Sequence, residues 1–441
     1  MKQMLRVGTI VVGLVFSGVA AALPEIQSWT TGKGARVLYV HASELPMVDV
    51  RLVFDAGSAR DREQSGIARL TNAMLDQGAA GLDAGEIAGG MEQRGAVLSG
   101  GSERDTAWLA LRSLTDPELF EPALELFGKV ISQPDFPPED FAREQRRMLA
   151  GLQYQKQQPR SIASRAFFQQ LYDQHPYASD PTGTEETVAA LTVDELEAFY
   201  RRYYVASNAV VVIVGDVPEA QARQIATGLA DNLETGEPAA ALPAVDTLEA
   251  QQKVHLEHPS AQSHVMMGQP GVQRKDPDYF PLYVGNHILG GSGLVSRISE
   301  EIREERGLAY SAYSYFVPME RKGPYTLGFQ TRNDQRDEAL SVLRETVTTF
   351  IAEGPTAQEL DAAQKNIVAG FPIRVASNSK IAEYLAVIGF YDLPLDYLET
   401  FPDRVQAVTN NQIKDAYRRR VHPQTMVTVI VGGEAEAQPA L

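Results

Sequence analysis

The order of apolar and polar positions predicts alternating strands and helices along most of the 441-residue chain. Runs of β-branched and aromatic residues with period two indicate strands, and apolar residues spaced three or four apart indicate helices. The predicted strands lie at residues 35–41, 47–54, 253–257 and 264–268. The predicted helices lie at residues 65–77, 279–289, 337–353 and 356–385. Alternation of this kind, with one face of each sheet covered, favours an α+β sandwich.

One segment of this pattern occurs twice. Residues 191–215 align without a gap on residues 408–432, and each reads as a helix, a Tyr-Arg-Arg motif, a loop and a buried strand. The shared positions include Thr192, Tyr200, Arg201 and Arg202 in the first copy and Thr409, Tyr417, Arg418 and Arg419 in the second. A supersecondary unit used twice at one spacing indicates a duplicated domain.

The boundary between the two copies is expected at residues 233–250. This segment is rich in alanine and contains Pro238 and Pro243, a composition typical of an exposed linker. We therefore expect two homologous α/β-sandwich domains, an N-terminal one over residues 23–232 and a C-terminal one over residues 251–441. A chain of 441 residues has the length of two ordinary domains.

Residues 1–22 have the pattern of a secretory signal peptide. Lys2 and Arg6 precede an apolar run at residues 7–19, and an alanine triplet at residues 20–22 supplies the cleavage site. The run is shorter than the ~20 residues that span a bilayer, and no other segment is apolar enough to cross one. We therefore expect an exported protein, in the bacterial periplasm, whose mature chain starts near Leu23 and is not stably inserted in the membrane.

Composition and charge narrow the function classes. Hydrophobic residues make up 44% of the chain and charged residues 22%, as in a globular protein. There is no cysteine, which excludes disulfides, zinc–thiolate sites and cysteine nucleophiles. Removal of residues 1–22 leaves 38 basic against 57 acidic residues, a net charge of −19. Such a surface repels nucleic acid.

Candidate chemistry concentrates at residues 290–316, which read as a glycine-rich turn, an amphipathic helix and a strand. Ser292 is the predicted N-cap of the helix. Leu294, Ile298 and Ile302 form its predicted buried stripe, and Gly307 is placed to end it. The strand is expected to form a hairpin with residues 323–331 around a turn at residues 320–323.

Arg303 in the last turn of this helix and Tyr310 at the start of the strand are seven residues apart. The turn between them is able to bring both side chains to the same side of the molecule, where the guanidinium of Arg303 would lie beside the phenol of Tyr310. The alternative from spacing alone is that Arg303 is a solvated helix charge and Tyr310 packs in a sheet.

The stretch resembles the second-half signature of the insulinase/pitrilysin family of zinc metallopeptidases, which includes mitochondrial processing peptidase. In that family a turn after a Gly-Gly pair leads into a helix with an arginine, and a tyrosine follows seven residues later. Both residues contact the peptide substrate near the scissile bond. The resemblance implies substrate binding at Gly290, Gly291, Ser292, Arg303 and Tyr310, and the duplicated sandwich fold of the processing peptidase.

The zinc motif of that family is missing. The family carries an inverted H-x-x-E-H motif on a helix, which puts two histidine ligands and a glutamate base on one face. The positions that match its two histidines and its glutamate are Arg69, Ala73 and Asn72, and an arginine in a ligand position repels a dication. The later helix keeps Glu144 but has Gly151 in the slot of the distal ligand. We therefore expect no metal and no catalytic residue on this chain alone.

The leading interpretation is a non-catalytic, substrate-binding subunit of an exported insulinase-like peptidase. Its partner would be a homologue that bears H-x-x-E-H and zinc, and the ligand of the complex would be a peptide. The first alternative is an inert peptide-binding or structural scaffold of the same fold, like the core proteins of respiratory complexes. The second is a self-sufficient peptidase, which would need a metal site that the sequence does not contain.

Overall fold

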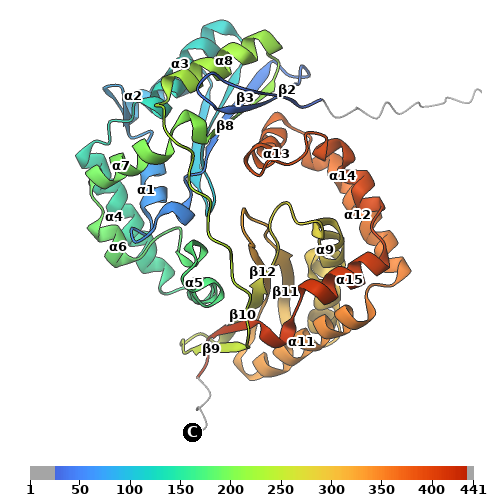
Figure 1. Cartoon of the computed structure of the whole chain (residues 1–441). Coiled ribbons are helices and arrows are strands. Elements are labelled where there is room, and N and C mark those ends of the chain that lie inside the picture. Colours follow the sequence, from blue (N-terminus) through green and yellow to red (C-terminus); the bar gives the residue numbers. More distant parts are fainter. Residues whose placement is uncertain (1–24, 435–441) are drawn as a thin grey trace, which may run out of the picture.

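The computed structural model describes residues 25–434, so the predicted signal peptide at residues 1–22 lies outside the described residues. Two sheets, each with its own set of helices, face one another across the molecule (Figure 1). The sheets occupy residues 27–215 and 252–431. The predicted architecture of two α/β-sandwich units is confirmed.

The N-terminal sheet has six strands in the order β1-β2-β8-β3-β7-β6. These are β1 (Gln27–Thr30), β2 (Arg36–His41), β3 (Met47–Phe54), β6 (Val97–Ser102), β7 (Ala107–Leu114) and β8 (Ala209–Gly215). The β2–β8 pair is parallel and the other pairs are antiparallel. Every residue of β8 is buried, since the strand lies inside the sheet and is covered on both faces. The strand β6 is at the edge.

Helices of the N-terminal half cover one face of this sheet (Figure 1). They are α1 (Ile67–Met74), α2 (Ala84–Glu92), α3 (Pro117–Ser132), α4 (Pro138–Gln155), α6 (Glu185–Ala190), α7 (Val193–Tyr203) and α8 (Glu219–Asn232). A two-stranded ribbon of β4 (Gly78–Ala79) and β5 (Leu82–Asp83) connects α1 to α2. The helix predicted at residues 65–77 is α1, and Ile67, Leu70 and Met74 are buried as expected.

The C-terminal sheet has five strands in the order β11-β12-β10-β13-β9. They are β9 (Gln252–Leu256), β10 (Gln262–Pro270), β11 (Ala309–Phe316), β12 (Pro324–Arg332) and β13 (Val427–Val431). Its helices are α9 (Tyr279–Asn286), α10 (Arg297–Ser299), α11 (Arg336–Glu353), α12 (Ala357–Arg374), α14 (Tyr397–Gln406) and α15 (Asn410–Arg420). The predicted hairpin is the antiparallel β11–β12 pair, and β11 is an edge strand.

The sequence repeat is a structural repeat. The first copy forms α7 and β8 and the second forms α15 and β13, each with a single turn of 3₁₀-helix between helix and strand. Thr192 and Thr409 cap the two helices in the same way, in capping boxes with Glu195 and Gln412. The predicted duplication is thus confirmed at the level of individual hydrogen bonds.

Each half also supplies one helix to the other half. The helix α5 (Pro159–Tyr172) packs on β10 and β13 of the C-terminal sheet, and α13 (Asn378–Phe390) packs on β2, β3 and β8 of the N-terminal sheet (Figure 1). Glycines make both approaches possible. A Cβ on Gly268 would lie 2.8 Å from Phe167 of α5, and a Cβ on Gly389 of α13 would lie 2.5 Å from Val210 of β8. The second face of each sheet is therefore covered from the opposite half.

The segment at residues 233–250 contains no helix or strand, but it is not the wholly exposed linker that its composition indicated. Leu242 and Val245 are buried in a small cluster with α5 and β13. Arg60 donates a 2.6 Å hydrogen bond to the carbonyl of Ala240, and Arg321 donates one of 2.7 Å to the carbonyl of Leu242. The segment is therefore bonded to both halves, through Arg60 of the N-terminal half and Arg321 of the C-terminal half. The domain boundaries at residues 232 and 251 stay predictions.

The single helix expected at residues 356–385 is wrong. The structure has two helices there, α12 and α13, separated at Val375–Ser377, and α13 is the exchanged helix. Ser377 is the N-cap of α13, and its hydroxyl accepts a hydrogen bond from the N–H of Lys380. The interruption lets the chain leave one half and reach the other. Within residues 25–434, no helix is both long enough and apolar enough to cross a membrane.

Candidate substrate-binding site

The glycine-rich turn between α9 and β11 is more irregular than the sequence predicted. A π-helical turn at His287–Gly291 is followed by a 3₁₀ turn at Gly293–Val295, by α10 and by a second π-helical turn at Glu300–Glu304. The N-cap of α10 is Ser296, in an extended conformation, so the prediction for Ser292 is wrong. π-Helical turns are rare and are frequent at functional sites.

The predicted buried stripe is correct at two of three positions. Ile298 and Ile302 are fully buried, but Leu294 is 59% exposed because it lies in the 3₁₀ turn, before the helix begins. Its neighbour Val295 is 83% exposed. Two adjacent aliphatic side chains are thus left in solvent next to the predicted site.

The two glycines of this turn are closely packed, Gly290 against β11 and Gly291 against the end of α9. A Cβ on Gly290 would lie 2.3 Å from the hydroxyl of Ser314, and one on Gly291 would lie 2.9 Å from the side-chain amide of Asn286. Asn286 and Ser314 bind each other through hydrogen bonds of 2.8 and 2.7 Å. Gly290 is therefore required for the close approach of the turn to the strand, and Gly291 for its packing on Asn286.

The end of the helix is as predicted. Gly307 has a positive φ of 60°, a conformation that favours glycine. Its N–H bonds the carbonyl of Arg303 at 3.0 Å, and the next N–H, of Leu308, bonds the carbonyl of Ile302 at 2.8 Å. The chain turns sharply here into β11.

This turn brings Arg303 and Tyr310 together. The guanidinium carbon of Arg303 lies 4.9 Å from the centre of the Tyr310 ring, in a cation–π contact. Tyr310 is 84% exposed, which excludes the alternative that it packs in the sheet. It is also skipped in the pairing of β11 with β12, where the register shifts between Ala309 and Ser311. A bulge of this kind re-aims a side chain out of the regular alternation.

An ion pair fixes this segment to the body of the C-terminal half. Arg297 of α10 makes a bidentate contact with Glu359 of α12, with nitrogen–oxygen distances of 2.5 and 2.7 Å. Burial raises the pKa of Glu359, but its bonds to Arg297 and to Thr356 outweigh this and lower the pKa to about 2. The carboxylate is therefore ionised at neutral pH and holds the helix that carries Arg303.

The positions of the family's zinc motif lie on α1 but do not form a metal site. Arg69 is exposed, whereas Asn72 is buried and donates a 3.3 Å hydrogen bond to the carbonyl of Trp108 in β7. Asn72 thus binds the backbone of the sheet with a neutral amide. Across residues 25–434, no group of three His, Asp or Glu side chains is arranged to hold a metal ion.

The second part of that motif lies on α4. Glu144 is buried and pairs with Arg147 at 2.7 Å, so the one acidic residue that is kept has a cation as its partner. Gly151 is exposed, and a Cβ there would meet nothing within 4 Å. The replacement residues are accommodated without strain. Whether the chain binds zinc in solution stays a prediction.

A hydrogen-bond network that no sequence pattern indicated connects the two halves. The buried carboxylate of Asp105, in the β6–β7 turn, accepts bonds from the hydroxyl of Tyr177 at 2.6 Å and from the hydroxyl of Tyr391 at 2.8 Å. It also accepts a 2.8 Å bond from the N–H of Glu320, in the β11–β12 hairpin. One carboxylate therefore ties the N-terminal sheet to the C-terminal hairpin and to the end of α13.

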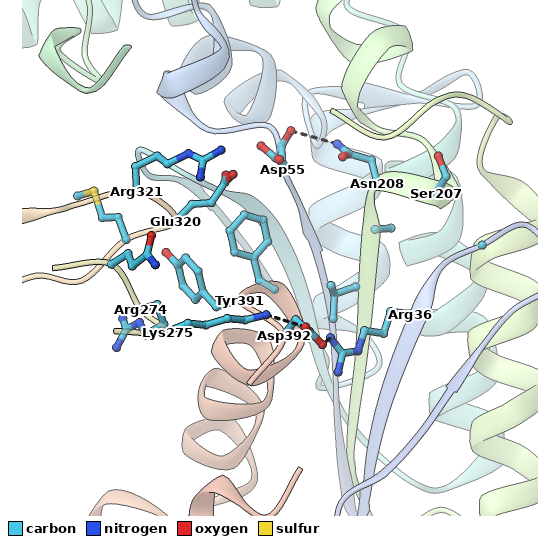
Figure 2. A pocket seen from close by; sticks show the side chains of 16 residues that line it. Arg36, Asp55, Ser207, Asn208, Arg274, Lys275, Glu320, Arg321, Tyr391 and Asp392 are labelled. Carbon is cyan, nitrogen blue, oxygen red and sulfur yellow. Dashed lines mark hydrogen bonds and ion pairs between the residues drawn. The ribbon is translucent and has the colours of Figure 1, made fainter. Parts of the chain in front are cut away.

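A cavity of about 500 Å³ lies beside this network, between the halves (Figure 2). In Figure 2, Lys275 and Arg36 approach the carboxylate of Asp392 from two sides, at 2.6 and 2.9 Å. Burial and the nearby Asp55 carboxylate raise the pKa of Glu320, which also lines this cavity. Asp392 is paired with two cations of this lining, and Asp55 is paired with Arg60, so we interpret this cavity as part of the contact between the halves.

Sequence profiles identify both halves. The profile of the insulinase peptidase family M16 matches residues 36–185, and that of the M16 inactive domain matches residues 190–367. The crystal structure of a peptidase M16 inactive domain from Pseudomonas fluorescens is 40% identical to this chain. It has a TM-score of 0.90 and covers 94% of this chain and 99% of that one. The chain therefore belongs to the M16, or insulinase, family of peptidases.

Two further relatives differ in function and in length. The non-peptidase homolog YmxG of Helicobacter pylori (strain ATCC 700392 / 26695) is 26% identical over 431 residues, which are 97% of this chain and 98% of that protein. The periplasmic protease PqqL of Escherichia coli shares the fold, with a TM-score of 0.80 at 18% identity over 94% of this chain but only 46% of that one. Within its family, this chain is thus similar to proteins described as an inactive domain and as a non-peptidase homolog.

Proposed function

We propose that the chain is the non-catalytic, substrate-binding subunit of an insulinase-like peptidase. In this proposal it is exported to the periplasm and pairs with a homologue that carries H-x-x-E-H and the zinc ion. The observation that carries the proposal is the contact between Arg303 and Tyr310, which persists and faces solvent while every metal ligand has been replaced. Half of a peptidase site has a use only if the other half is supplied.

The chemistry of the pair fits a role in peptide cleavage. Attack of a zinc-bound water on a peptide builds negative charge on the carbonyl oxygen, and a phenol and a guanidinium aimed at that oxygen stabilise it. Arg303 also lies 3.4 Å from the carboxylate of Glu304, which is not a close bidentate contact, so its guanidinium donors are free to bind a substrate. Gly290, Gly291 and Ser292 would border the same substrate.

An extended peptide also has a surface to pair with. The strand β11 is the edge of its sheet, and β6, beside α1, is the edge of the other sheet. Edge strands offer unpaired backbone donors and acceptors to an added strand. The exposed side chains of Tyr310 and Tyr315 mark β11 as the edge nearer the proposed site.

The length of a related protease supports the proposal of a companion subunit. The fold of this chain corresponds to 46% of the chain of PqqL, so that protease has a comparable length of further chain beside it. For this chain, we propose that the second pair of domains comes from a separate protein. The interface should bury well over ~1,000 Å².

The test is co-expression of residues 23–441 with an H-x-x-E-H homologue encoded by the same genome, followed by size exclusion and a peptide-cleavage assay. The expected result is one co-migrating complex whose activity exceeds that of either chain alone. A homologue in which the glutamate of H-x-x-E-H is replaced by glutamine is the matched control, since it should pair but not cleave. If the chains migrate separately and mixing leaves the activity unchanged, the inert scaffold is the better account.

A further inference from the structure

A second cavity, of about 350 Å³, lies within the C-terminal half next to the proposed site. It is bounded by α9, by the glycine turn at Gly291, by the C-terminal end of β11 and by the last residue of α12. Its volume is within the range of small-ligand pockets. Tyr315, half exposed on the edge strand β11, stands at its border.

Two arginines line this cavity, and no acidic residue does. Arg374 donates a 2.7 Å hydrogen bond to the hydroxyl of Tyr283 and has no carboxylate partner within residues 25–434. Arg274 lies over the ring of Tyr391, 5.2 Å from its centre, and its Nε is buried without a hydrogen-bond partner in the same part of the chain. Phenols are neutral at physiological pH, so neither guanidinium has a bonded carboxylate within residues 25–434; Arg274 also borders the first cavity, which Glu320 and Asp392 line.

Three other arginines of this half have carboxylate partners, whereas the half-buried Arg344 bonds the carbonyl of Pro423 and the hydroxyl of Thr428. Arg297 has Glu359, and Arg419 and Arg420 share Asp278. A position in the last turn of α12 favours a cation at Arg374 through the helix dipole. That does not account for Arg274, which comes from the loop before α9 and reaches the same cavity.

The remaining walls suit a flat or extended group beside the charges. Tyr279 and Tyr283 are stacked with their ring centres 5.8 Å apart, and Phe316 closes another side. His287 also lines the cavity, and burial together with Arg374 lowers its pKa, so the imidazole is neutral at pH 7 and adds no third charge. The site therefore offers two guanidinium forks in an aromatic enclosure.

We propose that this cavity binds a carboxylate of the peptide substrate, through Arg274 and Arg374. A guanidinium binds a carboxylate by paired hydrogen bonds, and a partly buried guanidinium that has no bonded carboxylate leaves donors available for one. The inference rests on the proposed function and adds a specificity to it. The carboxylate belongs either to an acidic side chain or to the C-terminus of the peptide, and both place one anion beside the edge of β11.

The test uses residues 23–441 and four matched fluorescent decapeptides that differ in only two ways: a central Glu or Gln, and a free or amidated C-terminus. Binding is measured by anisotropy at constant ionic strength. The wild type should bind one of the carboxylate-bearing forms about tenfold more tightly than the neutral peptide, the scale of a charge-assisted hydrogen bond. A preference for Glu assigns the site to a side chain, and a preference for the free terminus assigns it to the peptide end.

The variant R274Q/R374Q should lose this preference and bind the neutral peptide as the wild type does, to within about twofold. The matched control is R62Q/R146Q, which removes two exposed arginines of the N-terminal half and should keep the preference. Thermal unfolding checks that the variants fold. R374K provides a second test, because it keeps the charge at the end of α12 but removes the fork, and should weaken the preference.

The outcomes separate the two proposals. The carboxylate site is overturned, and the peptide-binding function stands, in either of two cases. The first is that the wild type binds all four peptides equally well. The second is that R274Q/R374Q still prefers the carboxylate-bearing peptide. If no peptide binds to the chain, both are overturned. Displacement of the acidic peptide by inorganic phosphate at concentrations where acetate has no effect would overturn the assignment to a carboxylate.

Discussion

The hydroxyl of Tyr391 donates a 2.8 Å hydrogen bond to the carboxylate of Asp105, which lies 286 residues earlier in the chain. Tyr391 follows the exchanged helix α13, and Asp105 is in the turn between β6 and β7. Tyr391→Phe should therefore lower the free energy of unfolding by about 1–3 kcal/mol, since a buried charged acceptor loses one donor. Urea unfolding measures this.

The matched control for that experiment is Tyr154→Phe, which removes a hydroxyl from a ring that is 65% exposed. It should leave the unfolding midpoint unchanged. If both variants unfold at the wild-type midpoint, the contact between Asp105 and Tyr391 contributes nothing to holding the halves together.

The mature chain alone should hold no stoichiometric zinc. The reason is the replacement of the family's ligands by Arg69, Ala73 and Gly151, with Asn72 in place of the catalytic base. Metal analysis of purified residues 23–441 at neutral pH is the measurement. A variant with histidine at positions 69 and 73 and glutamate at 72 and 151 is the positive control. One tightly held zinc ion in the wild type, with chelator-sensitive cleavage, would sink the interpretation.

Tyr310→Phe in the assembled complex should reduce turnover by roughly 10²-fold, the scale for the loss of one donor to a developing oxyanion. Arg303→Ala should weaken peptide binding by ~1.5–3 kcal/mol, as expected for a charge-assisted bond. Steady-state kinetics on one peptide measures both. Because Tyr310 is 84% exposed and Arg303 makes only a 3.4 Å contact with the exposed Glu304, neither change should unfold the protein. Near-normal activity of the Tyr310→Phe complex would mean that the pair is structural.

Gly290→Ala should destabilise the fold by about 1–3 kcal/mol, because the added Cβ would lie 2.3 Å from the hydroxyl of Ser314. Gly151→Ala on α4, where the Cβ meets nothing within 4 Å, should instead raise the stability by ~0.5–1 kcal/mol. Thermal or urea unfolding compares the two variants. A tolerated Gly290→Ala that impairs only the complex would favour substrate contact over packing as the role of that glycine.

The contribution of the ion pair between Arg297 and Glu359 to the free energy of unfolding should change with pH over a defined range. The pKa of Glu359 is about 2 in the fold, below its ordinary value of 4.5, so the pair stabilises the fold above about pH 4.5 and loses this effect as the pH falls toward 2. Glu359→Gln should cost about 1 kcal/mol at pH 7. The difference from wild type should shrink below pH 4.5. Glu92→Gln, at an exposed site, is the control, and a difference that does not vary with pH would contradict the assignment.

Sequence alone predicted the features that depend on short-range geometry. The left-handed Gly307, which ends the helix before β11, follows from local backbone chemistry. The approach of Arg303 to Tyr310 follows from that turn, and the structure confirms it. Residue types at fixed offsets were sufficient for these predictions.

The errors arose where packing between distant segments decides the outcome. Neither Ser292, before the 3₁₀ turn, nor Ser296, before α10, makes a side-chain capping bond, so the type of residue alone did not place the start of the helix. The interruption between α12 and α13 had a local signal in Pro372 and Ser377, but only the free face of the N-terminal sheet explains where α13 goes. Arg274 and Arg374 were missed because 100 residues separate them and no motif links them.

The exchange of α5 and α13 between the halves determines the order in which the two halves complete their folding. When a ribosome has completed the N-terminal sheet at β8, one face of that sheet still lacks its cover, and the missing helix ends only at Phe390. Contacts between residues so far apart in sequence close slowly. The face of the N-terminal sheet that α13 covers therefore stays exposed to solvent until nearly the whole chain has been synthesised. A chaperone that binds this apolar face would act during that interval.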